Sequence, residues 1–182
     1  MNNSKYVKDV HEIVNRATVS LEKLDTQEKN VREKLARDEL GATGAEAKRE
    51  EIGQQRRATV AAALADIDTI HNTFKEALER AQLVDASQLH EDAQLLNLPG
   101  LTLTDAQFTA LVEKHRDNPL MAQLLQGYQT AHPSLYSNMV IPTPENQKAA
   151  FADFLGAAKR AVREPGGMFS AFFADGKLDP VV

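Results

Sequence analysis

Histidines are the residues of this chain with the most specific potential chemistry, because an imidazole can bind a metal ion or move a proton near neutral pH. The sequence holds five, far apart along the chain: His11, His71, His90, His115 and His132. In an antiparallel helical hairpin over the first eighty residues, His11 and His71 would lie within about one turn of each other. A metal bridging them with Glu12 is conceivable, but no second spaced histidine pair supports it. We therefore expect no metal site.

Motifs of known enzyme classes are missing from the sequence. The dipeptide His90-Glu91 lacks the second histidine of the zinc-protease motif His-Glu-x-x-His. No phosphate-binding glycine loop, dinucleotide fingerprint or Gly-x-Ser-x-Gly elbow occurs. The chain has no cysteine, which removes disulfides, thiolate metal sites and cysteine nucleophiles together. We expect a protein that is not an enzyme and that uses no cofactor and no small-molecule substrate.

Charge and hydropathy narrow the classes of partner. The net charge is -5, and residues 1–84 hold 14 basic and 15 acidic side chains. Without an excess of Lys and Arg, nucleic acid is not expected as the main partner. The first residues lack the apolar core of a signal peptide, and no run approaches the roughly eighteen apolar residues of a membrane span. We expect a cytoplasmic or virion-associated protein with no Sec-type signal, no transmembrane segment and no membrane partner.

The distribution of proline and glycine predicts the domain organisation. All seven prolines lie at or after Pro99, and the first 98 residues contain only three glycines, which permits very long helices. Eight of the ten aromatic residues follow residue 84. The sequence predicts an all-α fold: a long, coiled-coil-like antiparallel hairpin over 1–84, a small helical domain over 85–164, and a hinge with an aromatic tail over 165–182.

Apolar residues in the hairpin region advance in steps of three and four, which places them on one face of each helix. The predicted packing positions are Val10, Ala17, Leu21, Leu24, Val31 and Leu35 on the first arm, and Ile52, Val60, Leu64, Ile67, Phe74 and Leu78 on the second. If facing residue numbers sum to about 86, apolar residues meet apolar ones, as Leu21 meets Leu64. This match favours an antiparallel hairpin.

Four residues are predicted to form the hairpin turn: Gly41, Thr43, Gly44 and Glu46. The first helix should end at Leu40, with Gly41 in the left-handed conformation that ends many helices. Thr43 should cap the second helix, and Glu46 three residues later completes a capping box. Inside that helix, Gly53 costs about 1 kcal/mol relative to alanine. Either the two helices approach closely at this glycine or the polar tip around it frays, and we expect it to fray.

Helix-start signals also divide the small domain. Ser87 is expected to cap a helix carrying Leu89, Ala93 and Leu96. Thr104 with Gln107 forms a capping box, and Asn118-Pro119 and Thr143-Pro144 each begin a further helix. An irregular connector over 134–141 should be held by three apolar side chains, Leu135, Tyr136 and Met139. These signals predict a compact cluster of short helices.

The tail begins at Pro165-Gly166-Gly167, a combination that breaks helices. Beyond it, a thioether and three rings lie within about two helical turns: Met168, Phe169, Phe172 and Phe173. One interpretation is a short helix that docks on its own domain. The other is a detachable peptide that inserts its rings into a partner's groove, where spaced apolar anchors supply most of the binding energy.

Two long helices cannot bury both flanks of their apolar faces against each other alone. The remaining width must be covered by the C-terminal domain, by another protein or by a second copy in a four-helix arrangement. We therefore expect a structural or assembly protein that acts through helix packing and docking, with a protein partner, a homo-oligomer or both. The competing hypothesis is a regulatory or chaperone-like helical module that holds a protein client.

The plan of a long hairpin, a small helical domain and an aromatic tail is similar to that of phage scaffolding and other virion assembly proteins. It also resembles in outline the helical-hairpin secretion substrates of type VII systems. The bend here reads Gly41-Ala42-Thr43-Gly44, where that second family carries Trp-x-Gly. The two resemblances imply a phage virion or scaffolding component, or a secreted helical-hairpin protein.

Overall fold

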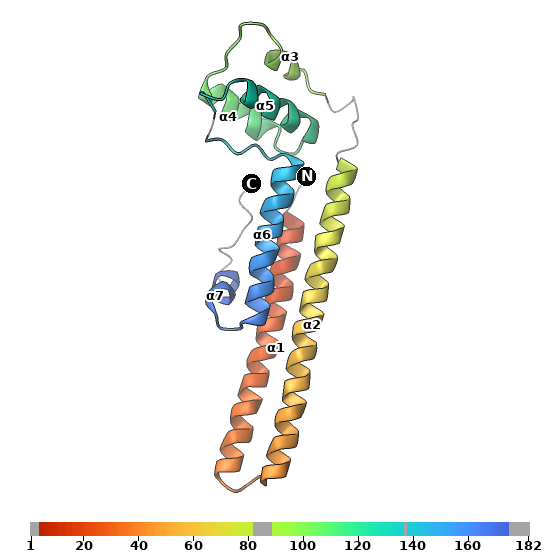
Figure 1. The fold of residues 1–182 in the computed structure, drawn as a ribbon, viewed down its shortest axis with the longest axis vertical. Coiled ribbons are helices and arrows are strands. Elements are labelled where there is room, and N and C mark those ends of the chain that lie inside the picture. Colours follow the sequence, from red (N-terminus) through yellow and green to blue (C-terminus); the bar gives the residue numbers. More distant parts are fainter. Residues whose placement is uncertain (1–3, 82–88, 137, 175–182) are drawn as a thin grey trace. The chain divides into compact units, whose positions relative to one another are not determined.

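The computed structural model describes residues 4–81, 89–136 and 138–174 of the 182-residue chain. Secondary structure within these ranges is helical and contains no strand (Figure 1). The helices are α1 (Ser4–Ala36), α2 (Ala42–Ala81), α3 (Ala93–Leu96), α4 (Asp105–Lys114), α5 (Pro119–Ala131), α6 (Pro144–Arg163) and α7 (Met168–Ala174). The all-α fold is confirmed, with two long helices first and shorter helices after them.

The chain divides into two compact units. The hairpin unit comprises residues 4–71 and 154–174, and the small helical unit lies within residues 72–153. Both boundaries fall inside helices, so α2 and α6 each contribute residues to both units. Residues 82–88, where the hairpin region was expected to end, and 175–182 of the expected tail lie outside the described ranges.

Helix α1 buries one continuous face. Its buried residues are Val7, Val10, Ile13, Val14, Ala17, Leu21, Leu24 and Val31, most of them three or four positions apart. On the outer face, ion pairs one turn apart, such as Lys8 with Glu12 and Lys29 with Glu33, link neighbouring side chains. Such exposed pairs add only a few tenths of a kcal/mol each. Burial of the apolar face therefore holds the long helix in place.

The turn between α1 and α2 differs from the sequence prediction. Helix α1 ends at Ala36, and the left-handed residue is Asp38, with φ 56°, where Gly41 was expected. The Glu39 N–H donates to the Lys34 carbonyl at 3.0 Å and the Asp38 N–H to the Leu35 carbonyl at 3.2 Å. These two bonds form a Schellman motif, which satisfies carbonyls that the end of the helix leaves without partners.

The second arm begins earlier than expected. Helix α2 starts at Ala42, so Thr43 and Glu46 lie within its first turns, and Thr43 does not occupy the cap position before the helix. The Gly41 carbonyl accepts the first helical bond, from the Ala45 N–H at 3.0 Å. Further along, Gly53 lies inside a continuous helix, and an added Cβ would meet only the Arg57 side chain, at 3.6 Å. The arms therefore do not depend on glycine for a close approach there.

Within the hairpin unit, the C-terminal segment covers part of the paired arms. The second half of α6 lies beside α1 and α2, and α7 packs on α1 (Figure 1). Lys159 Nζ on α6 donates to Asp68 Oδ1 on α2 at 2.5 Å. The buried residues that this half of α6 contributes are Phe154, Leu155, Ala157, Ala158, Ala161 and Val162. Of the three sources of cover expected from the sequence, the chain's own C-terminal segment supplies one.

The small helical unit has an aromatic core. The Phe108 ring of α4 stacks on two tyrosine rings, with its centroid 4.2 Å from that of Tyr136 and 5.9 Å from that of Tyr128. The Tyr128 hydroxyl accepts from the Leu103 N–H at 3.0 Å and donates to the Leu101 carbonyl at 3.1 Å. The Tyr136 hydroxyl donates to the Leu103 carbonyl. Side chains thus satisfy the Leu101 carbonyl and both backbone groups of Leu103, which is the buried residue of the extended segment 101–103.

Three of the predicted helix starts are confirmed by their hydrogen bonds. Thr104 and Gln107 form the full capping box of α4. Asn118 Oδ1 accepts from the Met121 N–H at 3.1 Å, with Pro119 as the first residue of α5. Thr143 Oγ1 accepts from the Asn146 N–H at 3.3 Å at the start of α6. Each cap is a local interaction over three residues, so the sequence carried all its components.

Two predictions in this unit are wrong. The helix expected from Ser87 is reduced to the four residues of α3, and Leu89 lies before it in non-helical chain with its side chain exposed. Ser87 itself lies outside the described residues. In the connector, Tyr136 is buried and Met139 partly buried, but Leu135 is exposed. Gln129 Nε2 holds this segment instead, through bonds to the carbonyls of Tyr136 at 2.6 Å and Met139 at 2.9 Å.

Candidate functional site

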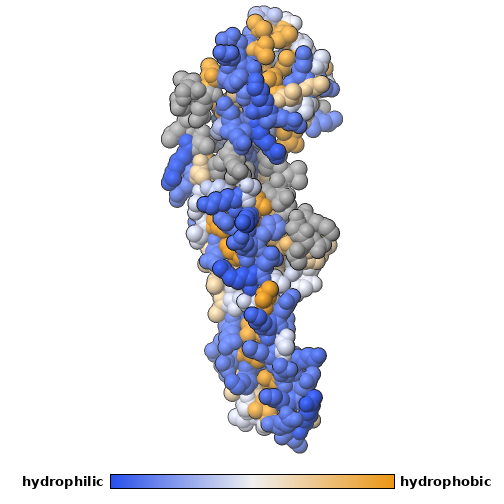
Figure 2. Space-filling model, turned by 180° about the vertical axis from the view of Figure 1, so that it is seen from behind, coloured by the Kyte–Doolittle hydropathy of each residue, from blue (hydrophilic) through white to orange (hydrophobic). Residues whose placement is uncertain are grey.

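The far part of the hairpin, from Leu21 through the turn to Val60, forms a seam between two helices. Its buried residues are Leu21, Leu24, Val31, Ala45 and Ile52, and Leu35, Leu40 and Val60 pack against them while only partly buried. All eight come from α1, the turn and α2. We call this set the far seam. Figure 2 shows apolar residues along the lower hairpin, between hydrophilic flanks.

A polar layer interrupts the far seam. The buried stripe of α1 skips from Leu24 to Val31, and Glu28 occupies the intervening position. Arg56 of α2 lies opposite, hydrogen-bonded to Asp25 and 3.9 Å from Glu28 Oε2. Arg56 and Glu28 are each about one-third exposed. Such a layer favours one pairing of the arms, because a slipped register would leave the charges facing apolar residues.

Ion pairs between the arms define the register. Arg16 Nη2 lies 2.7 Å from Asp66 Oδ2, and Arg56 bonds to Asp25. The residue numbers of these pairs sum to 82 and 81, whereas the sequence predicted a sum of about 86. The difference corresponds to about one turn of helix. It arises because α1 ends at Ala36, so the bend between the two arms comes earlier in the chain than predicted.

The structure buries most of the predicted hairpin residues. Val10, Ala17, Leu21, Leu24, Val31, Ile52, Ile67, Phe74 and Leu78 are buried, while Leu35, Val60 and Leu64 are partly buried. Among the turn residues, Gly41, Thr43 and Glu46 are exposed. Sequence reasoning missed Ala45 and Ala63, which are both buried on α2. The available signal was their spacing, seven residues before Ile52 and four before Ile67.

The tail residues divide between a docked side and an exposed side of α7. Phe173 is 1% exposed, with its ring 4.8 Å from His11 of α1 and 5.4 Å from Phe154 of α6. Phe169 is partly buried, and the Arg160 guanidinium lies 4.9 Å from its ring centroid. Met168 and Phe172 are 67% and 41% exposed. The described part of the tail docks on its own chain through two rings and leaves the other two apolar side chains in solvent.

A cluster of chemically versatile side chains lies in the small helical unit. We call it the histidine–aspartate cluster: His90 and Asp92 before α3, and His115 at the end of α4. His115 Nε2 lies 2.8 Å from Asp92 Oδ2, and His90 Nδ1 lies 3.3 Å from the same oxygen. The two imidazole centroids are 4.7 Å apart. His115 is 5% exposed, whereas the His90 side chain is about half exposed.

The electrostatics of this cluster centre on Asp92. Lys114 Nζ lies 2.7 Å from Asp92 Oδ2. Hydrogen bonds from Lys114 and His115 lower the pKa of the Asp92 carboxyl from 3.8 to about 2, against the opposing effect of partial burial. Favourable interaction with the charged form is the physical cause. The carboxylate is therefore ionised at neutral pH.

His11 and His71, considered from the sequence as a possible metal-binding pair, do not belong to the histidine–aspartate cluster. His11 lies in the aromatic contact with Phe154 and Phe173, and neither it nor His71 joins a group of three potential ligands within the described residues. His90 and His115 are 25 residues apart, and the packing around α3 brings them together. Their sequence spacing carries no local signal for such a cluster.

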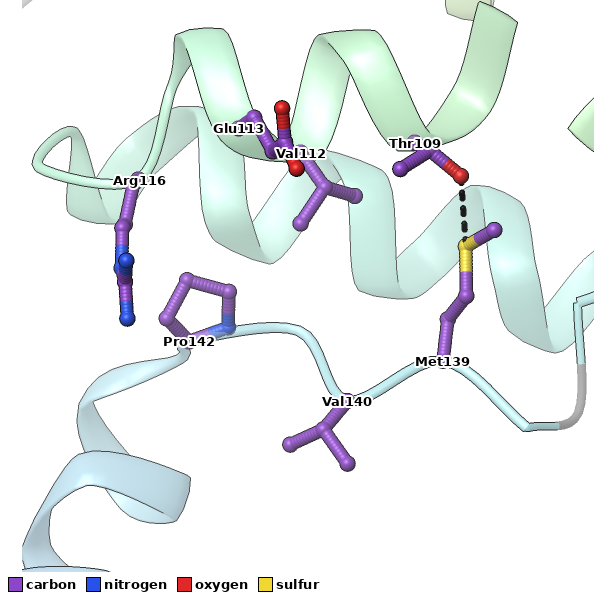
Figure 3. A pocket seen from close by; sticks show the side chains of 7 residues that line it. All are labelled: Thr109, Val112, Glu113, Arg116, Met139, Val140 and Pro142. Carbon is purple, nitrogen blue, oxygen red and sulfur yellow. Dashed lines mark hydrogen bonds between the residues drawn. The ribbon is translucent and has the colours of Figure 1, made fainter. Parts of the chain in front are cut away.

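The small helical unit also has a surface pocket of about 260 Å³ between α4 and the connector (Figure 3). Figure 3 shows the Thr109 hydroxyl facing Met139 Sδ, 3.6 Å away, with Arg116 and Pro142 at the other end. Val112 and Glu113 complete one wall, and the nearby Val140 side chain is exposed. This volume lies below the roughly 300–1,000 Å³ of most ligand pockets, so it suits a protein side chain better than a cofactor.

Comparison of the chain with protein families, with curated proteins and with solved structures finds no match in any of the three. Among the described helices, none combines the length and the apolar character needed to span a membrane.

Proposed function

We propose that the protein is a structural or assembly protein that pairs with a second copy of itself along the far seam. The observation that carries this proposal is the partial exposure of Leu35, Leu40 and Val60 at the edges of a two-helix seam. Near α6 and α7, the chain supplies its own cover. Every described member of the far seam comes from α1, α2 or their turn. Because no other described helix covers this seam, its edges remain partly exposed.

The hairpin of a second copy has the apolar edges and the charged outer faces needed to pair with this surface. Paired two-helix hairpins form four-helix arrangements in which apolar edges meet and charged outer faces stay in water. The polar face of this region carries both signs of charge, with pairs such as Lys48 and Glu51, so two copies need not repel each other. A symmetric pair uses the same patch on both molecules, which makes it self-complementary.

The test is the mass of the full-length chain in solution as a function of concentration, by sedimentation velocity and light scattering. We expect reversible association to an even-numbered oligomer. Val60→Glu should weaken it by about tenfold or more, because it puts a charge into the apolar contact. Ala58→Glu, an exposed position of the same helix, is the matched control and should associate normally. A folded chain that stays monomeric at high concentration contradicts the proposal.

The finer form of this proposal is a phage virion or scaffolding-type component. Long hairpins suit that work because they set a fixed spacing, at about 1.5 Å per residue of helix, while a compact unit docks elsewhere. Co-purification with assembling capsid or tail proteins tests the finer form. A defined homo-oligomer with no affinity for particle proteins would support the general proposal and exclude the viral one.

A second candidate is a module that holds a protein client, and one observation favours it. The small helical unit exposes several large apolar side chains: Leu89, Leu95, Leu98, Leu101, Leu135 and Val140. The pocket beside Val140 could receive an apolar side chain of a client. Stoichiometry separates the two functions, because a client module forms a one-to-one complex and remains monomeric alone.

A further inference from the structure

The histidine–aspartate cluster presents three potential metal ligands, two imidazoles and one carboxylate, on two segments of chain. The ligand atoms of His90, Asp92 and His115 all lie within 4.8 Å of one another. Imidazole nitrogens and a carboxylate oxygen are the donors that zinc takes in sites with three protein ligands. We propose that His90, Asp92 and His115 form a binding site for one zinc ion, with a fourth position open to water.

Two of the three distances between ligand atoms are close to those around a tetrahedral zinc ion. Ligand atoms about 2.0–2.1 Å from zinc stand roughly 3.3 Å from each other. The separation from His90 Nδ1 to Asp92 Oδ2 is already 3.3 Å, and that from His115 Nε2 is 2.8 Å. His115 must therefore withdraw by about half an ångström. The ligand atoms lie within 4.8 Å of one another, so binding also requires the two imidazole rings to move toward a common ion.

The surroundings of the site support both binding and entry. His115 is buried and follows α4, so its ring is held close to its ligand position before an ion arrives. His90 is on the exposed side, which gives the ion a path from solvent. In the metal-bound state the His90 Nδ1 lone pair, which accepts from the Asp92 N–H at 3.2 Å, would turn to the ion. Zinc would tie the chain before α3 to the end of α4.

Lys114 distinguishes a metal site from a purely structural ion pair. Its ammonium lies on the same Asp92 oxygen that the ion would use, so metal and Lys114 compete for it. The Lys114 side chain is about half exposed and can move into water. If the cluster binds zinc, replacing Lys114 with a neutral side chain raises the affinity. If the cluster is only an ion pair between Lys114 and Asp92, the same substitution leaves the affinity for zinc unchanged.

The experiment titrates full-length protein without a histidine tag with ZnCl₂, by calorimetry and by competition with a chromogenic chelator. We expect saturation at one ion per chain. His90→Gln and Asp92→Asn should each weaken binding by at least about tenfold, and Lys114→Gln should strengthen it severalfold. His132→Gln is the matched control, because His132 bonds to the Tyr128 carbonyl, away from the cluster, and should bind as the wild type does.

A second measurement keeps the test independent of folding effects. Long-range proton–nitrogen NMR of the histidine rings should show zinc-dependent shifts for His90 and His115 and none for His132. Circular dichroism of His90→Gln should match the wild type, because that side chain is exposed. The proposal is overturned by an absence of saturable binding, by binding that survives His90→Gln and Asp92→Asn, or by a Lys114→Gln variant that binds zinc no more tightly.

Discussion

The two units of this chain achieve stability in different ways. The far seam of the hairpin unit packs aliphatic and alanine side chains along two long helices, so no single residue dominates it. The small helical unit depends on Phe108, Tyr128 and Tyr136, because the Phe108 ring stacks on both tyrosine rings and the two tyrosine hydroxyls bond to the backbone of 101–103. Packing distributed along a seam tolerates local defects, whereas an aromatic core concentrates its free energy in a few positions.

The largest expected effect tests whether the stability of the small helical unit depends on a few aromatic residues. Phe108→Ala should lower the free energy of unfolding by about 3–5 kcal/mol, because it removes a fully buried ring that stacks on two tyrosines. Urea denaturation followed by circular dichroism measures it. Leu135→Ala, at an exposed position of the same unit, should change stability by less than about 1 kcal/mol. If the two variants lost the same unfolding free energy, the small helical unit would not concentrate its stability in the aromatic core, and it would not differ from the far seam in this respect.

The next effect concerns the docked tail. Phe173→Ala should cost about 2 kcal/mol, less than a ring in a central core, because a seven-residue terminal helix can release locally. Hydrogen exchange of residues 168–174 should accelerate in this variant. Phe172→Ala, at the exposed neighbouring position, is the control and should leave exchange unchanged. The same rates in both variants would mean that Phe173 does not anchor α7.

A smaller effect depends on pH. The pKa of Asp92 is about 2 in the folded chain against an ordinary 3.8, so the folded state binds this proton more weakly than the unfolded state. Its contribution to stability is present above about pH 4 and is lost as pH falls toward 2. Solvent around the half-exposed Lys114 reduces it to about 1 kcal/mol.

Comparison with Asp92→Asn measures this contribution. The difference in unfolding free energy between the wild type and the variant should shrink as pH falls from 5 to 2. The other carboxylates, present in both proteins, cancel in that difference. A difference that stays constant with pH would show that the charge of Asp92 does not stabilise the small helical unit.

The smallest effect has the opposite sign and belongs to the hairpin. Gly53→Ala should stabilise the protein by roughly 0.5–1 kcal/mol, because alanine loses less backbone entropy in a helix. An added Cβ meets only the end of the flexible Arg57 side chain. Thermal unfolding measures the gain. Destabilisation instead would indicate that a second copy or another partner approaches the helix at this glycine.

Local chemistry explains which parts of the fold could be predicted. The caps at Thr104, Asn118 and Thr143 need only residues within three positions, and the sequence identified them. The hairpin turn was misplaced because glycine was expected to take the left-handed position that Asp38 occupies. Aspartate tolerates that conformation better than most side chains, and a Schellman motif in the backbone leaves little mark on the sequence.

Non-local packing explains what could not be predicted. The partial burial of α7 follows from where α6 places it, and four similar apolar residues gave no sign of which two would face inward. The histidine–aspartate cluster joins positions 25 residues apart through the packing of α3. Amphipathic spacing predicted which face of each helix is buried, but not which distant side chains would meet across an interface.

The layer of Glu28 and Arg56 has a consequence for how the chain reaches its fold. Two uniform apolar helices could pair in several registers of similar energy, and a chain trapped in one would need to open before trying another. In this hairpin, a slip of one heptad would separate Arg56 from Asp25 and Glu28 and place its charge against aliphatic side chains. Misaligned pairings are therefore short-lived, and the search through registers is biased toward the native one.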